Sequence, residues 1–402
     1  MSTHLWKVTL HIIPASHIRG FPRGVQDEQQ NSQLRLSVKQ YTPLTNPGHL
    51  TLLIAHGVGS AKEVYEPFLD ELLAQNIPIR SAWSIDIVNH GQSYVLNEKI
   101  IGDEPHWLDP ARDYLHAVNH FQSQMPPPIY GIGQSWGCVN IVMMSHIHPR
   151  LFAGMILMEP TFETGYKHQS YNQPGTLKDS ESRMALLAKR RDTWPSRSDA
   201  RTRLHKNPYF ASYDPRVFNR MIQYGLRDRP TPTNPHAVTL TTPKAQEVYL
   251  FGRPDPPFPG YEAAPDYSHR TPATKSANGF YRGEVEPIKR ALGGLRPPVL
   301  YIWGTESDIG NSAYPQRVIE QTGVGDEGSG GERTGQVQSK YVEGGDHLIP
   351  FKMPVKAAAI IAGWLRGEVE RWEEEARRRR TEQPPFEPGV LNALWMERIS
   401  KL

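Results

Sequence analysis

Apolar residues follow two different periods along the first 160 positions of the chain. Strand-like runs, either alternating or continuously apolar, are expected at 6–13, 34–41, 50–55, 80–85, 128–131 and 154–158. Apolar residues at helical spacing lie over 62–73 and 110–122, and again after residue 137. This alternation predicts an α/β fold, with a mostly parallel sheet and helices on both of its faces.

The alternation stops at about residue 161 and resumes with strands at 298–303 and 337–342, which brings the expected sheet to eight strands. Between them, 178–224 reads as short helices rich in aromatic residues, and the following proline-rich part reads as irregular. So long an interruption of a compact core is typical of a lid. We therefore expect core segments at 1–160 and 291–366, a lid or cap insertion at 161–290, and a charged helix with a C-terminal tail at 367–402.

Composition and charge narrow the classes of function. The 402 residues include 45 Lys and Arg against 42 Asp and Glu, a net charge of +3, which suggests neither nucleic acid nor a membrane surface as a partner. With one cysteine no internal disulfide can form, and no apolar run is long enough for a transmembrane helix. His116 and His120 have the spacing of a zinc pair, but Ala117 stands where such motifs carry a general base. We expect no metal and no cofactor.

Gly133, Ser135 and Gly137 form a Gly-x-Ser-x-Gly motif where an expected strand meets an expected helix. In this context the motif predicts a nucleophile elbow, a sharp turn that exposes the serine hydroxyl. Glycines flank the serine because the turn is strained and a Cβ would collide with neighbouring backbone. Ser135 is therefore the candidate nucleophile, whereas we expect Cys138 to be a buried, small apolar side chain.

A serine hydroxyl needs a base, and the base needs an acid that orients it. His347 follows the last expected strand, where a glycine-containing loop can carry the base to the sheet edge. Two acids are candidates. Glu159 follows the strand after the elbow helix, whereas Asp308 follows the next strand, one residue beyond the Gly-x-x-Asp position that Ser307 occupies. Because a one-residue shift in a turn redirects a side chain, the sequence favours Glu159 and keeps Asp308 as the alternative.

Backbone N–H groups are the expected donors to the oxyanion of a tetrahedral intermediate. The residue directly after the nucleophile, Trp136, supplies the first of these donors. The second is expected in the loop after the third strand, where the run His56-Gly57-Val58-Gly59 has the required glycine freedom. We assign the N–H of Val58 to this role and expect His56 to brace the loop.

The chain ends in Ser400-Lys401-Leu402. A C-terminal Ser-Lys-Leu is an address read by the peroxisomal import receptor, so the sequence predicts the peroxisomal matrix as the location and that receptor as a partner. The alternating N-terminal residues are typical of a strand rather than of a secretory signal. The sequence leaves the oligomeric state open, with a homodimer among the alternatives.

Taken together, these motifs resemble a group of fungal peroxisomal α/β hydrolases, which includes the yeast peroxisomal lipase, hydrolases of host-selective toxin pathways and the mycophenolic-acid acyl-CoA hydrolase. The resemblance covers the core rather than the expected lid. It is carried by Ala55-His56-Gly57 with Lys62-Glu63, Val88-Asn89-His90-Gly91-Gln92-Ser93, Trp107 with Asp109, Arg112 and Asp113, Glu159-Pro160, the glycine-rich run 323–331, and Gly345 with His347-Leu348.

The resemblance implies the α/β-hydrolase fold and a Ser–Asp/Glu–His triad whose acid follows the strand after the nucleophile helix, which supports Glu159. One departure is Gln134, because such relatives usually carry histidine before the serine. The resemblance implies nothing about the residues of the lid, and we expect the lid to determine the choice of substrate.

The sequence thus predicts a peroxisomal serine hydrolase that cleaves an acyl thioester or ester through Ser135, His347 and Glu159. Acyl-CoA is the favoured substrate class, and the resemblance implies a role in secondary metabolism. A lipase or carboxylesterase acting on lipid esters is the alternative, because an aromatic lid suits an apolar acyl chain equally well. A non-catalytic interaction protein on the same fold is the remaining alternative.

Overall fold

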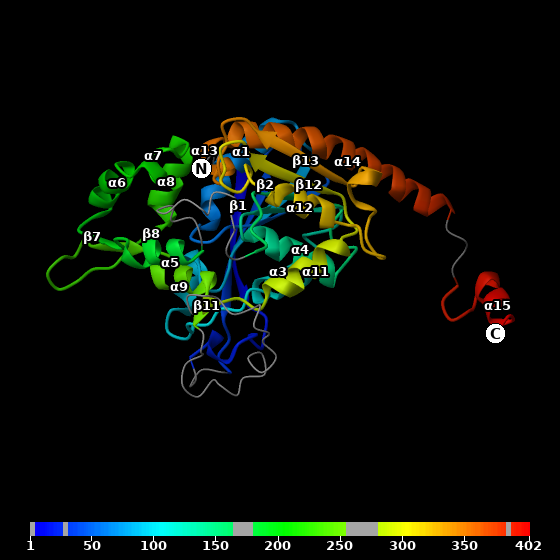
Figure 1. The fold of residues 1–402 in the computed structure, drawn as a ribbon, viewed down its shortest axis with the longest axis horizontal. Helices are drawn as coiled ribbons and strands as arrows, with labels where there is room; N and C mark the ends of the chain where they lie inside the picture. The colour runs from blue at the N-terminus through cyan, green and yellow to red at the C-terminus, as the bar shows by residue number, and fades with distance from the viewer. Residues whose placement is uncertain (1–4, 27–30, 164–179, 255–279, 383–386) are drawn as a thin grey trace.

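The computed structural model describes residues 5–26, 31–163, 180–254, 280–382 and 387–402. At its centre is an eight-stranded sheet in the order β1-β2-β4-β3-β5-β6-β12-β13 (Figure 1). Strand β2 runs antiparallel to its neighbours β1 and β4, and the other pairings are parallel. The strands are β1 (Trp6–Pro14), β2 (Arg35–Pro43), β3 (Leu50–Ala55), β4 (Ile79–Asp86), β5 (Ile129–Gln134), β6 (Gly154–Met158), β12 (Val299–Gly304) and β13 (Val337–Val342). The predicted mostly parallel, eight-stranded sheet is confirmed.

Side chains of the central strands enter two hydrophobic clusters on opposite faces of the sheet. In β3, Leu53 and Ala55 belong to one cluster, whereas Leu52 and Ile54 belong to the other, and all four are fully buried. Because successive side chains of a strand point to opposite faces, a run of apolar residues without polar interruption implies cover on both sides. The two clusters are the two interfaces between the sheet and its helical layers.

The first layer contains helices α3 (Asp109–His120), α4 (Gly137–Ile147), α11 (Val285–Gly293) and α12 (Tyr314–Gln321). The second contains α1 (Glu66–Ala74), α13 (Ile349–Lys352) and the long helix α14 (Pro354–Glu382). Helix α2 (Gly91–Asn97) packs at β2 and β4, and short 3₁₀ turns lie at Pro22–Gly24, Lys62–Tyr65 and Gly331–Thr334. Helix α4 is buried at every position from 137 to 145, which explains its almost uniformly apolar sequence.

An insertion between β6 and β12 forms a separate layer of short elements, shown in green in Figure 1. It contains α5 (Ser180–Lys189), β7 (Thr193–Trp194), α6 (Arg197–His205), α7 (Pro208–Ala211), α8 (Pro215–Tyr224), β8 (Leu226–Asp228), β9 (Val238–Leu240) and α9 (Lys244–Phe251), followed by the short pair β10 (Arg253–Pro254) and β11 (Phe280–Tyr281). We call residues 180–251 the lid. The lid helices contribute apolar side chains to the second core cluster, so the lid packs on the body.

The short helices predicted over 178–224 are present in the described part of that range. The prediction that the following proline-rich part is irregular is wrong between 226 and 251, because β9 pairs with both β7 and β8 and is followed by α9. This small sheet could not be predicted from local sequence, because strands of two or three residues are too short for a periodic pattern and are stabilised by pairing with their partners. The parts of the expected lid at 164–179 and 255–279 lie outside the described residues.

Two expected domain boundaries fall inside helices. Helix α11 crosses residue 290, and its side chains Val285, Ile288 and Leu292 belong to the first core cluster. Helix α14 continues through residue 366 as a single helix of 29 residues, with its first turns in the core and its charged end beyond the body (Figure 1). Among the described residues, no helix combines the length and apolarity needed to span a membrane.

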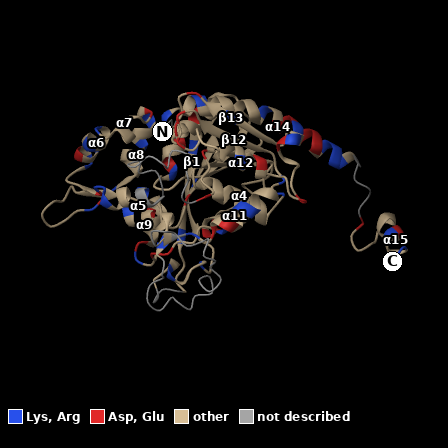
Figure 2. Ribbon diagram, in the orientation of Figure 1, with Lys and Arg blue, Asp and Glu red and all other residues tan. Residues whose placement is uncertain are grey.

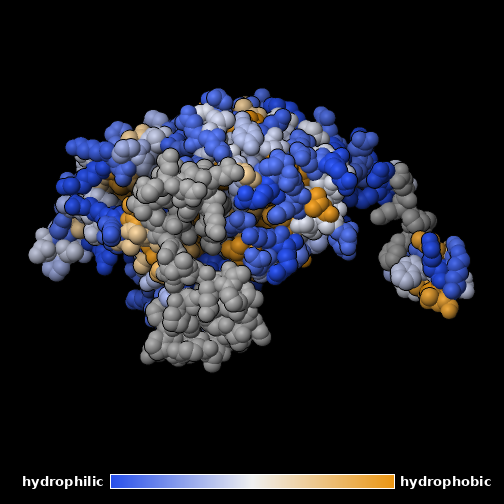
Figure 3. Space-filling view, viewed as in Figure 1, coloured by the Kyte–Doolittle hydropathy of each residue, from blue (hydrophilic) through white to orange (hydrophobic). Residues whose placement is uncertain are grey.

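The C-terminal helix α15 (Ala393–Ile399) stands apart from the body (Figure 1). Apolar residues of this end, among them Leu394 and Trp395, are exposed. Figure 3 shows an orange patch at this end of the molecule. Ser400, Lys401 and Leu402 follow this helix and are all exposed. The three terminal residues are therefore accessible in this conformation.

A buried ion-pair network joins the sheet to the segment that enters α1. The ammonium group of Lys62 lies 2.6 Å from Asp86 at the end of β4 and 3.0 Å from Glu63, with no exposure of the Lys62 and Asp86 side chains. Lys39 from β2 pairs with Glu63 at 3.1 Å. Burial opposes the charge of Lys62, but Asp86 and Glu63 outweigh it and raise its pKa above the ordinary value. The network fixes the turn that follows β3.

Replacing Lys62 by methionine should lower the free energy of unfolding by about 3–5 kcal/mol, because the Asp86 carboxylate would remain buried without its counter-charge. Chemical denaturation measures this change. Lys340→Met on the exposed side of β13 is the matched control and should stay within about 0.5 kcal/mol of the unsubstituted protein. Equal stabilities of the two variants would contradict the importance given to this network.

Candidate active site

A strained turn presents Ser135 between β5 and α4. Ser135 has a φ of +54°, which side chains other than glycine rarely adopt, and its N–H donates to the carbonyl of Met158 at 2.9 Å. A Cβ at Gly133 would lie 2.7 Å from the Cα of Cys138, and one at Gly137 would lie 2.1 Å from the carbonyl oxygen of Ala55. Only glycine fits on either side of the serine, so the motif and the turn require one another.

His347 lies in hydrogen-bond contact with Ser135. The loop after β13 carries this histidine, whose Nε2 is 2.8 Å from the Ser135 hydroxyl oxygen. On the other side of the ring, Nδ1 is 3.3 Å from Oε2 of Glu159. Because a carboxylate only accepts, Nδ1 carries the proton and Nε2 is left to accept from the serine. This is the tautomer that a general base needs.

Glu159 directly follows β6 and has no solvent exposure. Its φ of +49° is again positive, and its carboxylate accepts from the backbone N–H of Gly304 at 2.6 Å and from the hydroxyl of Ser307 at 2.5 Å. With His347 it therefore has three donors, which orient it firmly. Asp308 lines the adjacent cavity, but the contact with His347 is made by Glu159.

Ser307 is a member of the site whose role the sequence analysis missed. It occupies the position where a Gly-x-x-Asp turn would place an acid, and it donates a hydrogen bond to the acid that comes from the neighbouring strand. Its place in the turn was visible in the sequence. Its partner was not, because β6 and β12 become neighbours only in the assembled sheet.

Gln134 joins three parts of the site. Its side-chain Nε2–H donates to the backbone carbonyl of His347 at 3.0 Å, and its Oε1 accepts from the hydroxyl of Tyr65 at 3.1 Å. The same hydroxyl of Tyr65 accepts from the N–H of Gly57 at 3.0 Å. Gln134 therefore links the elbow to the histidine loop and to the loop after β3. From the sequence, this residue was notable only as a departure from the family that the chain resembles.

The loop after β3 brings Val58 to the same cavity as Trp136. Across the described part of the chain, neither backbone N–H donates to a protein acceptor. The next N–H, that of Gly59, donates to Nε2 of His90 at 2.9 Å. Burial and the nearby His56 lower the pKa of His90 well below its usual range, so its ring stays neutral and able to accept.

His56 is completely buried beneath this loop. Its Nδ1–H donates to the carbonyl of Gly57 at 2.9 Å, and its Nε2 accepts from the N–H of Ile87 at 3.1 Å. Burial lowers the pKa of His56, in keeping with a neutral ring that braces the backbone. Cys138 is also fully buried, and burial raises the pKa of its thiol well above the usual range, so it remains protonated.

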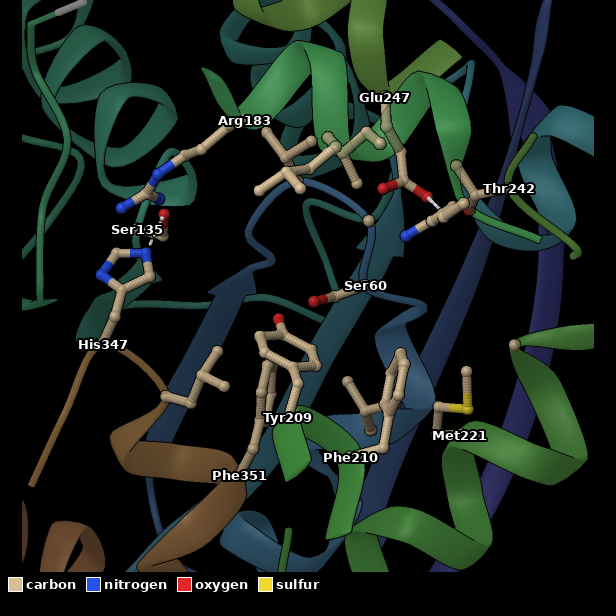
Figure 4. Close-up of a pocket in the computed structure, with 18 of the residues that line it drawn as sticks. Ser60, Ser135, Arg183, Tyr209, Phe210, Met221, Thr242, Glu247, His347 and Phe351 are labelled. Carbon is tan, nitrogen blue, oxygen red and sulfur yellow. Dashed lines mark hydrogen bonds and ion pairs between the residues drawn. The ribbon is translucent and has the colours of Figure 1, made fainter. Parts of the chain in front are cut away.

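A cavity of about 1090 Å³ opens between this site and the lid. In Figure 4, Ser135 and His347 lie at one end, whereas Tyr209, Phe210 and Met221 of the lid and Phe351 of α13 form an apolar wall further along. Arg183 reaches from α5 toward Ser135 and His347. Within the described residues, no three His, Cys, Asp or Glu side chains are grouped as metal ligands.

Known proteins are similar to this chain in sequence and in fold. Residues 52–360 match the alpha/beta hydrolase family. The type I acyl-CoA thioesterase mpaH of Penicillium brevicompactum is 33% identical, over 94% of this chain and 91% of its own length. The abhydrolase domain-containing protein AKT2 of Alternaria alternata is 25% identical, over 60% of this chain and 84% of its own length.

A solved structure extends the similarity to nearly the whole chain. The peroxisomal alpha-beta-hydrolase Lpx1 of Saccharomyces cerevisiae superimposes with a TM-score of 0.70, covering 99% of this chain and 96% of its own, at 18% sequence identity. At that identity the likeness shows the fold alone. From the matched family, the thioesterase relatives and the Ser135 elbow, we conclude that the chain is a member of the alpha/beta hydrolase family.

Proposed function

We propose that the protein is a serine hydrolase that cleaves acyl-CoA thioesters. The observation that carries this proposal is the chain of hydrogen bonds from Ser135 through His347 to Glu159 at the end of a large, lid-covered cavity. The identity of 33% with an acyl-CoA thioesterase supports the thioester as the substrate bond.

In the proposed mechanism, Nε2 of His347 removes the Ser135 proton as the serine oxygen attacks the thioester carbonyl carbon. Glu159 holds the ring and stabilises the imidazolium, while the N–H groups of Val58 and Trp136 donate to the oxyanion. Collapse of the tetrahedral intermediate breaks the C–S bond, and the thiol leaves with the proton from His347. Water, deprotonated by the same ring, then attacks the acyl-serine. His347 returns this proton to the departing Ser135 oxygen, and the carboxylic acid leaves.

Cleavage of lipid esters by a lipase or carboxylesterase is the second candidate. It is favoured by the apolar side chains that line the cavity, among them Leu186, Leu187 and Phe210 of the lid and Phe351 of the core. Both reactions use the same nucleophile and differ in the group that leaves. The lid, rather than the relay of Ser135, His347 and Glu159, therefore separates the two candidate functions.

We propose the peroxisomal matrix as the site of action. The accessible Ser400-Lys401-Leu402 end supports import by the peroxisomal receptor. The role in secondary metabolism and the homodimer stay predictions that neither the fold nor the family tests.

Ser135→Ala should lower thioesterase turnover by at least about 10³-fold and abolish labelling by a fluorophosphonate probe, because no other group replaces the attacking oxygen. Gel fluorescence and hydrolysis of a panel of acyl-CoAs, glycerides and simple esters provide the measurements. The control is Ser60→Ala, which removes another cavity serine and should keep the label. An unlabelled wild type, or a labelled Ser135→Ala, would overturn the hydrolase proposal.

Glu159→Gln should lower kcat by about 10²- to 10⁴-fold, because an amide cannot hold His347 in the same tautomer and charge state. Asp308→Asn makes the corresponding change at the alternative acid and should leave kcat within about threefold, since Nδ1 of His347 is bonded to Glu159. Single-turnover kinetics compare the two variants. A collapse of turnover in Asp308→Asn alone would reverse the assignment.

Deleting Ser400, Lys401 and Leu402 should move an N-terminally fluorescent fusion from peroxisomal puncta to the cytosol, because the receptor reads a free Ser-Lys-Leu end. A variant with one glycine added after Leu402 keeps the whole chain while blocking the free terminus, and it should also be cytosolic. Live-cell microscopy gives the distribution. Puncta that persist after the deletion would refute this address.

A further inference from the structure

The lid carries a charge of its own. Residues 180–251 contain 13 Lys and Arg against six Asp and Glu, a net +7, so that the rest of the chain has −4 when the whole has +3. Lysines and arginines, blue in Figure 2, recur along the lid helices. Charge segregated in this way favours an anionic ligand at that side of the molecule.

Five of these cations line the active-site cavity, and three of the five are Arg191, Arg203 and Lys206. Within the described residues, none of the three side chains has an ion pair or a hydrogen bond. Arg190, in contrast, pairs with the buried Glu247 and is already neutralised. Lys206 follows Arg203 by three residues at the end of α6, a spacing that places both side chains on one face.

The opposite, core side of the cavity is acidic. Glu306 and Asp308 line it beside His347, as does Asp346, which pairs with Lys352. The anionic end of a ligand would therefore be repelled by the core side of the cavity and attracted by the lid. The cavity is thus polarised from the nucleophile toward the lid.

We infer that Arg191, Arg203 and Lys206 form a subsite for the phosphate groups of coenzyme A. This inference rests on the proposed acyl-CoA thioesterase function. Coenzyme A carries its phosphates at the end remote from sulfur, joined by the long pantetheine arm. With the thioester carbon at Ser135, the phosphates reach away from the nucleophile, and guanidinium groups suit phosphate oxygens by bidentate geometry.

Arg183 is not part of this subsite. It lines the cavity and, in the view of Figure 4, points toward Ser135 and His347 rather than away from the nucleophile. Two simpler roles of the other cations make different predictions. Basic residues in the last turn of α6 also complement the helix dipole, and a positive lid also attracts any anion from a distance.

The test compares one acyl group on three thiols: coenzyme A, 3′-dephospho-coenzyme A and N-acetylcysteamine, which has no phosphate. The double variant Arg203→Ala/Lys206→Ala should raise KM for the CoA thioester by about tenfold or more, since charged hydrogen bonds are lost. The effect should be smaller for dephospho-CoA and below about twofold for N-acetylcysteamine, with kcat unchanged. Arg191→Ala should behave in the same way with a smaller increase.

Arg201→Ala is the matched control. It removes the same charge from the same helix, but Arg201 hydrogen-bonds to Asn219 and does not line the cavity. An equal rise in KM for this control would show long-range attraction only. An equal rise for N-acetylcysteamine, or a loss of thermal stability that accounts for it, would show a structural role. Either result would overturn the subsite, as would an unchanged KM in the double variant.

Direct binding of free coenzyme A, measured by calorimetry, separates this inference from the proposed reaction. If the wild type binds coenzyme A but not pantetheine, and the double variant loses this preference, the subsite stands even where no thioester is cleaved. If thioesters are cleaved but binding ignores the three cations, the reaction stands and the subsite falls.

Discussion

The left-handed turn at Ser135 is the constraint on which the rest of the site depends. A residue with a Cβ is held at a φ of +54° because its N–H is bound to Met158 and because the backbone of α4 approaches β3 at Gly137. Such a turn costs about 1–3 kcal/mol and persists only where surrounding structure determines it. The surrounding structure is the buried centre of the sheet with α4 behind it. The fold thus supplies the energy that exposes the serine oxygen.

A second positive-φ residue, Glu159, stands at the end of the neighbouring strand. Parallel strands end at a common edge, so the elbow, the acid and the loop of His347 converge there from three places in the sequence. Gln134 and Tyr65 then tie the histidine loop and the loop of Val58 to the elbow. The geometry of the relay is therefore carried by strand ends, which are rigid, and by side chains that are buried with hydrogen-bond partners.

Core and lid contribute different things to the cavity. The core supplies the relay and an acidic edge, whereas the lid supplies an apolar wall and cations without partners in the described part of the chain. Specificity can change in the lid without disturbing the turn at Ser135, because the lid is inserted between β6 and β12 and contributes no strand to the central sheet. This division is general in folds where a fixed scaffold carries variable connections.

The sequence by itself determined the eight strands, the elbow and the pairing of Ser135 with a histidine after the last strand. Those features are written locally, as apolar periodicity, as glycines at fixed offsets and as order along the chain. It favoured Glu159 over Asp308, but only the tertiary structure placed the Glu159 carboxylate against His347 and gave it the hydroxyl of Ser307. It also decided the lid sheet, the continuity of α14 and the role of Gln134. These contacts join residues far apart in the chain. No local pattern encodes which side chains meet at the ends of neighbouring strands once the sheet has assembled.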